Sequence, residues 1–210
     1  SAIATKFALA AAAQAWVRAG LGDKTGRRTA DVDPDRAGVY LGSGEGPLDY
    51  PTFVDANVRG WDPEVRDVIA DRWAEVAMAR STAAAEVEQE PHVALTHVAR
   101  AFGLGGPALN CMTACAASTQ AVGEATAIIR RGDAEVMLAG GAHSMIHQLG
   151  MTGFIRLTAM SDRRDDPQHA SRPFDKTRDG FVMGEGAGIV VLEELEHTKA
   201  RGAPILAEVA

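Results

Sequence analysis

Apolar positions change their spacing from segment to segment, between helical periods and short continuous runs. Apolar residues that recur every three or four positions predict helices, and short apolar runs bounded by glycine or proline predict buried strands. We expect helices at residues 4–21, 92–102, 115–131 and 193–201, and strands at residues 37–41, 108–112, 135–139, 189–192 and 205–209. Helices that alternate with short buried strands indicate an α/β fold with crossover connections.

Glycine-rich segments border two of these strands. Residues 42–46 (Gly-Ser-Gly-Glu-Gly) predict a flexible turn at the carboxyl end of the first strand, where open α/β sheets tend to bind ligands. The turn lacks the Gly-Lys-Ser/Thr ending of a phosphate-binding loop, so it does not indicate a nucleotide site. The glycines between residues 180 and 188 imply close backbone packing or positive φ angles.

Two longer segments give weaker signals. Residues 63–90 are charged and helix-prone, and Trp73, Val76 and Met78 form a broken apolar stripe that we expect to cover part of the sheet or a dimer surface. Residues 161–178 are polar and predict a loop.

The composition favours one soluble domain with a sizeable core, because 46% of the 210 residues are hydrophobic and 23% are charged. No apolar run is long enough for a membrane span and no leader is recognisable, so we expect a cytoplasmic protein. Two cysteines are too few for a disulfide framework or a four-thiolate zinc site, and we expect both to be reduced.

The net charge of −7 argues against nucleic acid as the main partner, because no basic face dominates. Small basic clusters are either docking elements for an acidic protein or solvated surface, and the second interpretation is favoured. These clusters are Lys24/Arg27/Arg28, Arg130/Arg131 and Arg163/Arg164.

Cys115 lies where an apolar strand-like run breaks into small residues and opens a helix, within the sequence Asn-Cys-Met-Thr-Ala-Cys-Ala-Ala-Ser at residues 110–118. The unsatisfied N–H groups and the dipole of a helix N-terminus favour a thiolate, which is a nucleophile at neutral pH. A free cysteine more often only packs in a core, so this remains the alternative. The helix that follows is so rich in small side chains that we expect it to be a buried central helix.

Several short motifs occur in the order and spacing of a known family. They are Gly106-Pro107, Thr113-Ala114-Cys115-Ala116, Gly132-Asp133-Ala134-Glu135-Val136-Met137, Gly140-Gly141, Ser171-Arg172-Pro173-Phe174-Asp175, Arg178-Asp179-Gly180-Phe181, Gly184-Glu185-Gly186-Ala187-Gly188 and Leu192-Glu193-Glu194. The chain resembles the β-ketoacyl-acyl-carrier-protein synthases of the thiolase-like superfamily, most closely the elongating type II enzymes. The resemblance covers nearly the whole chain apart from roughly residues 50–88. It implies a layered α/β/α/β/α fold, of which residues 1–210 would be most of the N-terminal half, without its first strand and without the C-terminal half.

The resemblance also implies a reaction. Cys115 would take an acyl group from an acyl-carrier protein, and the carbanion from decarboxylated malonyl-acyl-carrier protein would then attack the acyl-cysteine. The backbone N–H of Cys115 would contribute to the oxyanion hole, and Ala114 and Phe154 would border the acyl pocket. The family forms homodimers with aligned sheets, and we expect no cofactor.

The two histidines that the family uses for decarboxylation belong to its second half, so none of the six histidines here is assigned a catalytic role. His143 and His147 have the i, i+4 spacing of a metal pair but lack an acidic residue and a third ligand, so we expect no metal. Asp175, Asp179 and Glu185 could form a carboxylate cluster, and the resemblance implies that they hold loops together.

Two alternative functions remain open from the sequence. The first is another acyl transfer within the thiolase superfamily, against which residues 172–175 and 179–181 argue by their resemblance to the elongating enzymes. The second is a non-catalytic partner subunit that sets chain length, against which Cys115 argues. The sequence does not predict the acyl chain length or the choice between fatty-acid and polyketide synthesis.

Overall fold

The computed structural model describes residues 3–29, 31–44 and 48–209, so Glu45 and Gly46 of the predicted glycine-rich turn lie outside the described residues. Contacts within the chain divide it into two compact units. The first comprises Ser1–Gly46, Ala83–His143 and Gly186–Ala210, and the second comprises Pro47–Thr82 and Ser144–Glu185.

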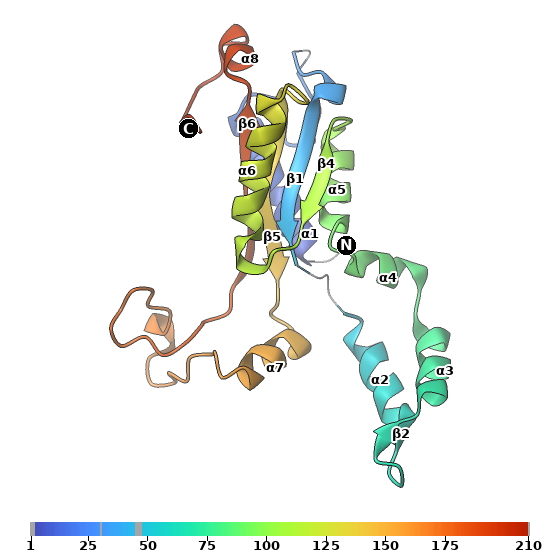
Figure 1. The fold of residues 1–210 in the computed structure, drawn as a ribbon. Coiled ribbons are helices and arrows are strands. Elements are labelled where there is room, and N and C mark those ends of the chain that lie inside the picture. The colour runs from blue at the N-terminus through green and yellow to red at the C-terminus, as the bar shows by residue number, and fades with distance from the viewer. Residues whose placement is uncertain (1–2, 30, 45–47, 210) are drawn as a thin grey trace. The chain divides into compact units, whose positions relative to one another are not determined.

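The first unit is built on a four-stranded sheet of order β4-β1-β5-β6. Its strands are β1 (Ala37–Ser43), β4 (Ala108–Cys111), β5 (Val136–Ser144) and β6 (Glu185–Glu193). Strand β1 pairs in parallel with β4 on one side and with β5 on the other. Strand β6 runs antiparallel to β5, because Glu194 N–H donates to Glu135 O at 2.9 Å while Gly188 lies opposite Gly140 (Figure 1).

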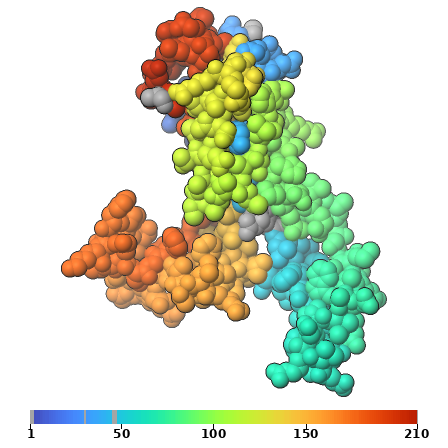
Figure 2. All heavy atoms as spheres, viewed as in Figure 1, coloured from blue at the N-terminus to red at the C-terminus, as the bar shows by residue number. Residues whose placement is uncertain are grey.

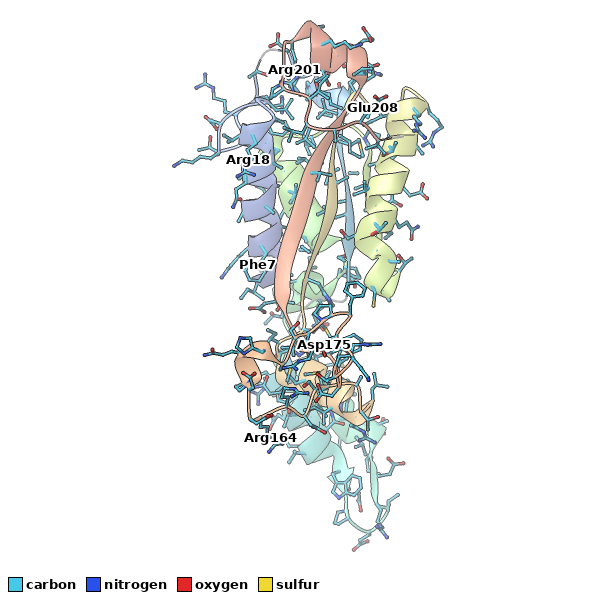
Figure 3. The ribbon with its side chains drawn as sticks, turned by 90° about the vertical axis from the view of Figure 1, so that its left-hand side faces the viewer. Phe7, Arg18, Arg164, Asp175, Arg201 and Glu208 are labelled. Carbon is cyan, nitrogen blue, oxygen red and sulfur yellow. The ribbon has the colours of Figure 1, made fainter. Side chains whose placement is uncertain are left out.

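Helices cover both faces of this sheet. Helices α1 (Ile3–Arg18) and α5 (Val93–Phe102) lie on one face, and α6 (Ala117–Arg130) lies on the other (Figure 1). Figure 3 shows α1, which carries Phe7 and Arg18, and α6 on opposite sides of the sheet. The shorter elements of this unit are α4 (Ala83–Gln89), α8 (Leu195–Ala200) and the 3₁₀ turns η1 (Pro34–Arg36) and η2 (Ala114–Ala116). The expected α/β class with crossover connections is therefore confirmed.

Successive side chains of β5 enter different cores. Val136 and Leu138 belong to the larger cluster, which includes Trp16 of α1, whereas Met137 and Ala139 pack with α6. A parallel strand covered on both faces has an almost continuous apolar sequence. This explains why the segment reads as a short apolar run without alternation.

Helix α6 is buried along one row of small side chains, in which Ala117, Ala121 and Ala125 follow each other at four-residue intervals. Most residues of its other face are exposed, and the yellow-green atoms of α6 form much of the visible face of this unit in Figure 2. Within the described residues, the expected buried central helix is thus buried on one face only. The small side chains serve the close approach of α6 to the sheet.

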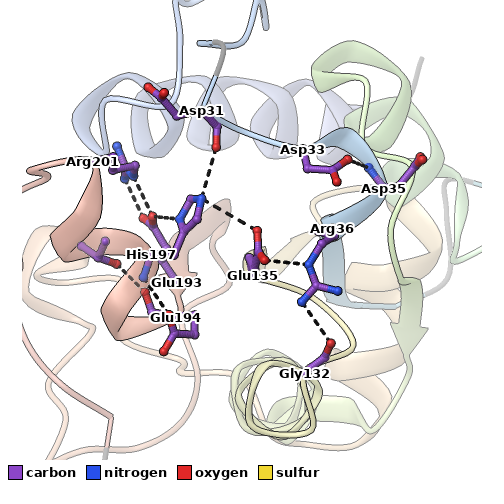
Figure 4. A network of polar contacts seen from close by, with 11 residues as sticks. Asp31, Asp33, Asp35, Arg36, Gly132, Glu135, Glu193, Glu194, His197 and Arg201 are labelled. Carbon is purple, nitrogen blue, oxygen red and sulfur yellow. Dashed lines mark hydrogen bonds and ion pairs between the residues drawn. The ribbon is translucent and has the colours of Figure 1, made fainter.

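Charged side chains join segments at the amino ends of β1 and β5 (Figure 4). Arg201 donates to both carboxylate oxygens of Glu193 at 2.6 Å, and both side chains are at most 9% exposed. Arg36 Nε donates to Glu135 Oε1 at 2.7 Å. These pairs tie α8, β6 and the start of β5 into one closed end of the sheet.

His197 lies at the centre of this network. Its Nδ1 is 2.5 Å from Glu193 Oε1, and its Nε2 is 3.2 Å from the carbonyl oxygen of Asp31. Burial lowers the pKa of His197, but the hydrogen bonds to Glu193 and Asp31 and the charges of Glu193 and Glu135 together raise it above the usual value. The imidazolium form is therefore favoured by its surroundings.

The second unit contains α2 (Tyr50–Gly60), the short antiparallel pair β2 (Trp61–Asp62) and β3 (Asp67–Val68), α3 (Ala70–Arg80), α7 (Gln148–Arg156) and η3 (Pro167–His169). Helices α2 and α3 pack against each other. Gly60 allows Trp73 to lie close, because a Cβ at residue 60 would be 3.2 Å from Trp73 Cβ. Trp73 thus packs on α2, whereas Met78 is 81% exposed. The expectation that this stripe covers part of the sheet or a dimer surface stays a prediction.

Two expected strands differ from the structure. Strand β6 begins at Glu185 instead of residue 189, so Gly186 and Gly188 belong to the strand. Gly140 accommodates this pairing, because a Cβ there would collide with the carbonyl oxygen of Gly188. Residues 205–209 form no strand, and Leu206 is 94% exposed. Across the described ranges, no helix is long and apolar enough to cross a membrane.

Candidate active site

Three strands end beneath the first turn of α6. Gly42 of β1 is paired with Cys111 of β4 and with Gly141 of β5, so these residues form one row across the carboxyl edge of the sheet. A Cβ at Gly42 would lie 2.5 Å from both Ala117 O and Ser118 N, and a Cβ at Gly141 would lie 2.9 Å from Ser118 Cβ. The two glycines therefore let α6 approach the strand ends more closely than any side chain would allow.

Cys115 lies at this point, in the 3₁₀ turn η2 between β4 and α6. The residue is exposed within the described part of the chain. Ala116 N–H donates to Thr113 O and Ala117 N–H donates to Ala114 O. Among the described residues, no backbone acceptor is recorded for the Cys115 N–H, which leaves it available to a ligand.

Ala114 has a φ of 51°, which is unusual for a residue with a Cβ. This left-handed conformation costs about 1–2 kcal/mol relative to the right-handed one. It turns the chain sharply between the end of β4 and the start of η2. Strained residues of this kind are concentrated at active sites, so the backbone singles out the residue directly before Cys115.

The second cysteine has a different environment. Cys111 is 8% exposed, and its thiol donates to the carbonyl oxygen of Ala117 at 3.2 Å. Burial, followed by the negative charge of Glu124, raises the pKa of the Cys111 thiol above its usual value. Both cysteines are free. Cys111 is therefore a protonated, enclosed thiol, whereas Cys115 is accessible.

A hydrogen-bond chain that the sequence did not reveal ties the strand ends to the start of α5. The side-chain amide of Asn110 donates to Leu41 O at 2.9 Å and to Ser43 Oγ at 2.7 Å. Ser43 Oγ in turn donates to Pro91 O at 2.7 Å. These partners are 48 to 69 residues apart in the chain, so no local pattern could have indicated them.

Phe154, the second residue expected at the acyl pocket, lies in α7 of the second unit. It is partly buried, and its ring meets that of Phe181 edge to face with centroids 6.3 Å apart. Its position at an acyl pocket stays a prediction, as does that of Ala114.

The two histidines with the i, i+4 spacing lie in different elements. His143 is in β5, and His147 caps α7 by accepting the Gly150 N–H at 3.2 Å, so the two do not share a helix face. In the described part of the chain, no group of three or more His, Cys, Asp or Glu side chains could hold a metal ion.

Of the three carboxylates that the resemblance assigns to loop structure, two bond within loops and one joins two strand ends. Asp175 accepts from the backbone N–H and hydroxyl of Thr177, at 2.6 and 2.7 Å. Asp179 accepts from Ser161 Oγ at 2.7 Å, and Glu185 accepts from Ser144 Oγ at 2.5 Å. The expectation that these carboxylates hold loops together therefore agrees with the structure for Asp175 and Asp179, whereas Glu185 of β6 joins the end of β5.

An open cleft of about 730 Å³ lies elsewhere in the first unit, along residues 25–29 and 100–103. Arg28 of the first basic cluster donates there to the carbonyl oxygens of Phe102 and Gly103, at 3.2 and 2.6 Å. Arg28 thus caps the C-terminus of α5. None of the expected site residues lines this cleft.

The sequence of this chain matches a known family. The family described as "Beta-ketoacyl synthase, N-terminal domain" matches residues 3–198. A 3-oxoacyl-[acyl-carrier-protein] synthase 2 of Rhizobium meliloti is 41% identical over 208 residues, which cover 97% of this chain and 44% of that protein.

Solved structures give the same result. A β-ketoacyl synthase from Burkholderia phymatum has a TM-score of 0.77 and 32% identity, over 96% of this chain and 44% of its own. A type II polyketide synthase acyl-carrier protein in complex with its ketosynthase bound to the hexaketide has a TM-score of 0.73 and 31% identity, over 95% of this chain and 45% of that chain. The chain spans less than half the length of these proteins. It belongs to the β-ketoacyl synthase family and contains that family's N-terminal domain.

Proposed function

We propose that this chain supplies the nucleophile of a condensing enzyme, a β-ketoacyl-acyl-carrier-protein synthase of the elongating type. Cys115 attacks the carbonyl carbon of an acyl thioester, the carbon–sulfur bond to Cys115 forms, and the carrier thiol leaves. Loss of CO₂ from a malonyl thioester then gives a carbanion that attacks the acyl-cysteine. The new carbon–carbon bond releases Cys115 as thiolate and yields a β-ketoacyl thioester two carbons longer.

The observation that carries this proposal is the turn at Cys115. Cys115, whose thiol is exposed, follows the strained residue Ala114 at the N-terminal end of α6. The backbone N–H of Cys115 has no backbone acceptor among the described residues. A sulfur nucleophile and an oxyanion donor on one residue suit acyl transfer, because the tetrahedral intermediate needs both within a few ångströms. Ala114 and Phe154 are proposed to border the acyl chain.

The proposed partners follow from the relatives. The Rhizobium meliloti relative is named as an acyl-carrier-protein synthase, and one structural neighbour contains an acyl-carrier protein. We assign the same type of partner here. A bacterial relative supports a cytoplasmic location, although plant relatives are named as chloroplastic and mitochondrial.

We also propose a homodimer in which β4 meets its copy. Strand β4 is at the edge of the sheet, and its residue Leu109 is 45% exposed. An uncovered edge strand is a ready template for pairing with another chain. Analytical ultracentrifugation of the full-length protein tests this proposal, and a monomer at all concentrations would refute it.

Intact-protein mass spectrometry tests the enzymatic role. The full-length protein and its Cys115→Ala variant are incubated with an acyl-carrier-protein thioester. We expect a mass gain equal to the acyl group that is lost in the variant, and peptide mapping should place it on Cys115, because Cys111 is enclosed. No adduct on either protein would contradict the transferase and favour a non-catalytic chain-length subunit.

A further inference from the structure

The buried thiol of Cys111 touches the element that carries the proposed nucleophile. Its sulfur is 3.2 Å from the carbonyl oxygen of Ala117, the first residue of α6. Ala117 also donates its N–H to Ala114 O, which closes the 3₁₀ turn around Cys115. Only Ala116 separates Ala117, which the Cys111 thiol contacts, from Cys115.

The surroundings leave this contact little freedom. Cys111, Ala117 and Ala121 form a small buried cluster with Tyr40 packed against it. On the neighbouring strand, Gly42 leaves no room between its backbone and Ala117. Any movement of α6 toward the sheet is blocked at Gly42, and movement away from it would break the bond from the Cys111 thiol.

We infer that Cys111 is a positioning residue, whose thiol holds the first turn of α6 on the sheet and thereby fixes the backbone N–H and thiol of Cys115 for reaction. In this proposal Cys115 reacts, and Cys111 positions it. This inference rests on the proposed function for its consequence in acyl transfer, but the position of Cys115 can be measured without that reaction.

The test compares Cys111→Ala, Cys111→Ser and Val98→Ala in the full-length protein. Alanine removes the donor, serine keeps a donor of similar size, and Val98 is a fully buried residue of α5 on the other face of the sheet. The rate of Cys115 alkylation by iodoacetamide is measured for each, together with kcat, KM and the unfolding midpoint.

We expect Cys111→Ala to change the alkylation rate of Cys115 at least threefold and to lower kcat about tenfold with little change in KM, because small displacements of a reacting group have large effects on rate. Cys111→Ser should recover most of kcat. Val98→Ala should lower the unfolding midpoint and leave the alkylation rate unchanged.

Wild-type alkylation and kcat in Cys111→Ala would overturn the inference. The inference would also fail if Cys111→Ala and Cys111→Ser lost kcat equally and Val98→Ala lost kcat in the same proportion to its unfolding midpoint. Packing alone would then explain the loss. If the wild-type protein shows no acyl transfer but the alkylation rate still depends on the residue at position 111, the proposed function fails and the positioning role stands.

Discussion

Substitution of Gly42 by alanine is the sharpest perturbation of the proposed active site that leaves the reactive residue itself unchanged. The new Cβ would lie 2.5 Å from Ala117 O and from Ser118 N, both of them backbone atoms of the first turn of α6. Ordinary contact begins at 3.4 Å and the nearest atom, Ala117 C, would lie at 2.3 Å, so the backbone must move away by 3.4 − 2.3 = 1.1 Å. Neither partner is a flexible side chain, so the helix end has to move.

The displacement should affect stability and activity differently. Forcing extra volume into a packed region typically costs about 1–3 kcal/mol, which urea denaturation monitored by circular dichroism can measure. A shift of about 1 Å at a reacting group can reduce the rate about 100-fold. The rate of Cys115 acylation by an acyl-carrier-protein thioester, followed by mass spectrometry, should therefore fall far more than the folded fraction.

Gly123→Ala is the matched control, because it lies in the same helix and a Cβ there would meet nothing within 4 Å. Alanine in a helix interior is favoured over glycine by about 0.5–1 kcal/mol, so this variant should be slightly more stable. If Gly42→Ala acylated Cys115 at the wild-type rate, the close approach of α6 to β1 would have no role in placing the nucleophile.

Two further predictions concern the charged network and the strained turn. His197→Asn should reduce the free energy of unfolding more at about pH 5.5 than at about pH 8.5. A group whose pKa is raised on folding stabilises the fold below its unfolded pKa, and this effect is lost as pH rises through its folded pKa. An equal loss in urea titrations at both pH values would show that protonation of His197 is not coupled to folding. Ala114→Gly should change the free energy of unfolding by less than about 1 kcal/mol, since relief of the left-handed strain offsets the greater freedom of the unfolded chain. Ala121→Gly, at a fully buried position of α6, should lose more than about 1 kcal/mol when both variants are measured by urea titration. A similar loss at both positions would contradict the strain at Ala114.

Local patterns were enough to predict most of the sheet and the place of Cys115. The apolar runs at β1 and β5 are short and continuous because both faces of the sheet are covered there. The break after Cys111 into small residues marks the turn at which α6 begins. Both signals lie within a few residues of the feature that they predict.

Other features depend on partners that are remote in the chain. Residues 205–209 have the apolar composition of a strand but find no neighbouring strand among the described residues, and a strand exists only through pairing. The contact from Cys111 to Ala117 depends on the close approach that Gly42 permits, 69 positions earlier than Cys111. A local sequence pattern does not show that Cys111 will be enclosed, because part of its surroundings, Tyr40, comes from another strand.

The closed network around Glu193, His197 and Arg201 has a consequence for how substitutions are distributed in this domain. It fastens the sheet at the amino ends of β1 and β5, whereas Cys115 lies beyond their carboxyl ends. The charged contacts that hold the segments together and the proposed nucleophile thus lie at opposite ends of the same strands. Substitutions around Cys115 therefore leave the contacts of the fastened end, and with them the amino ends of the strands, unchanged.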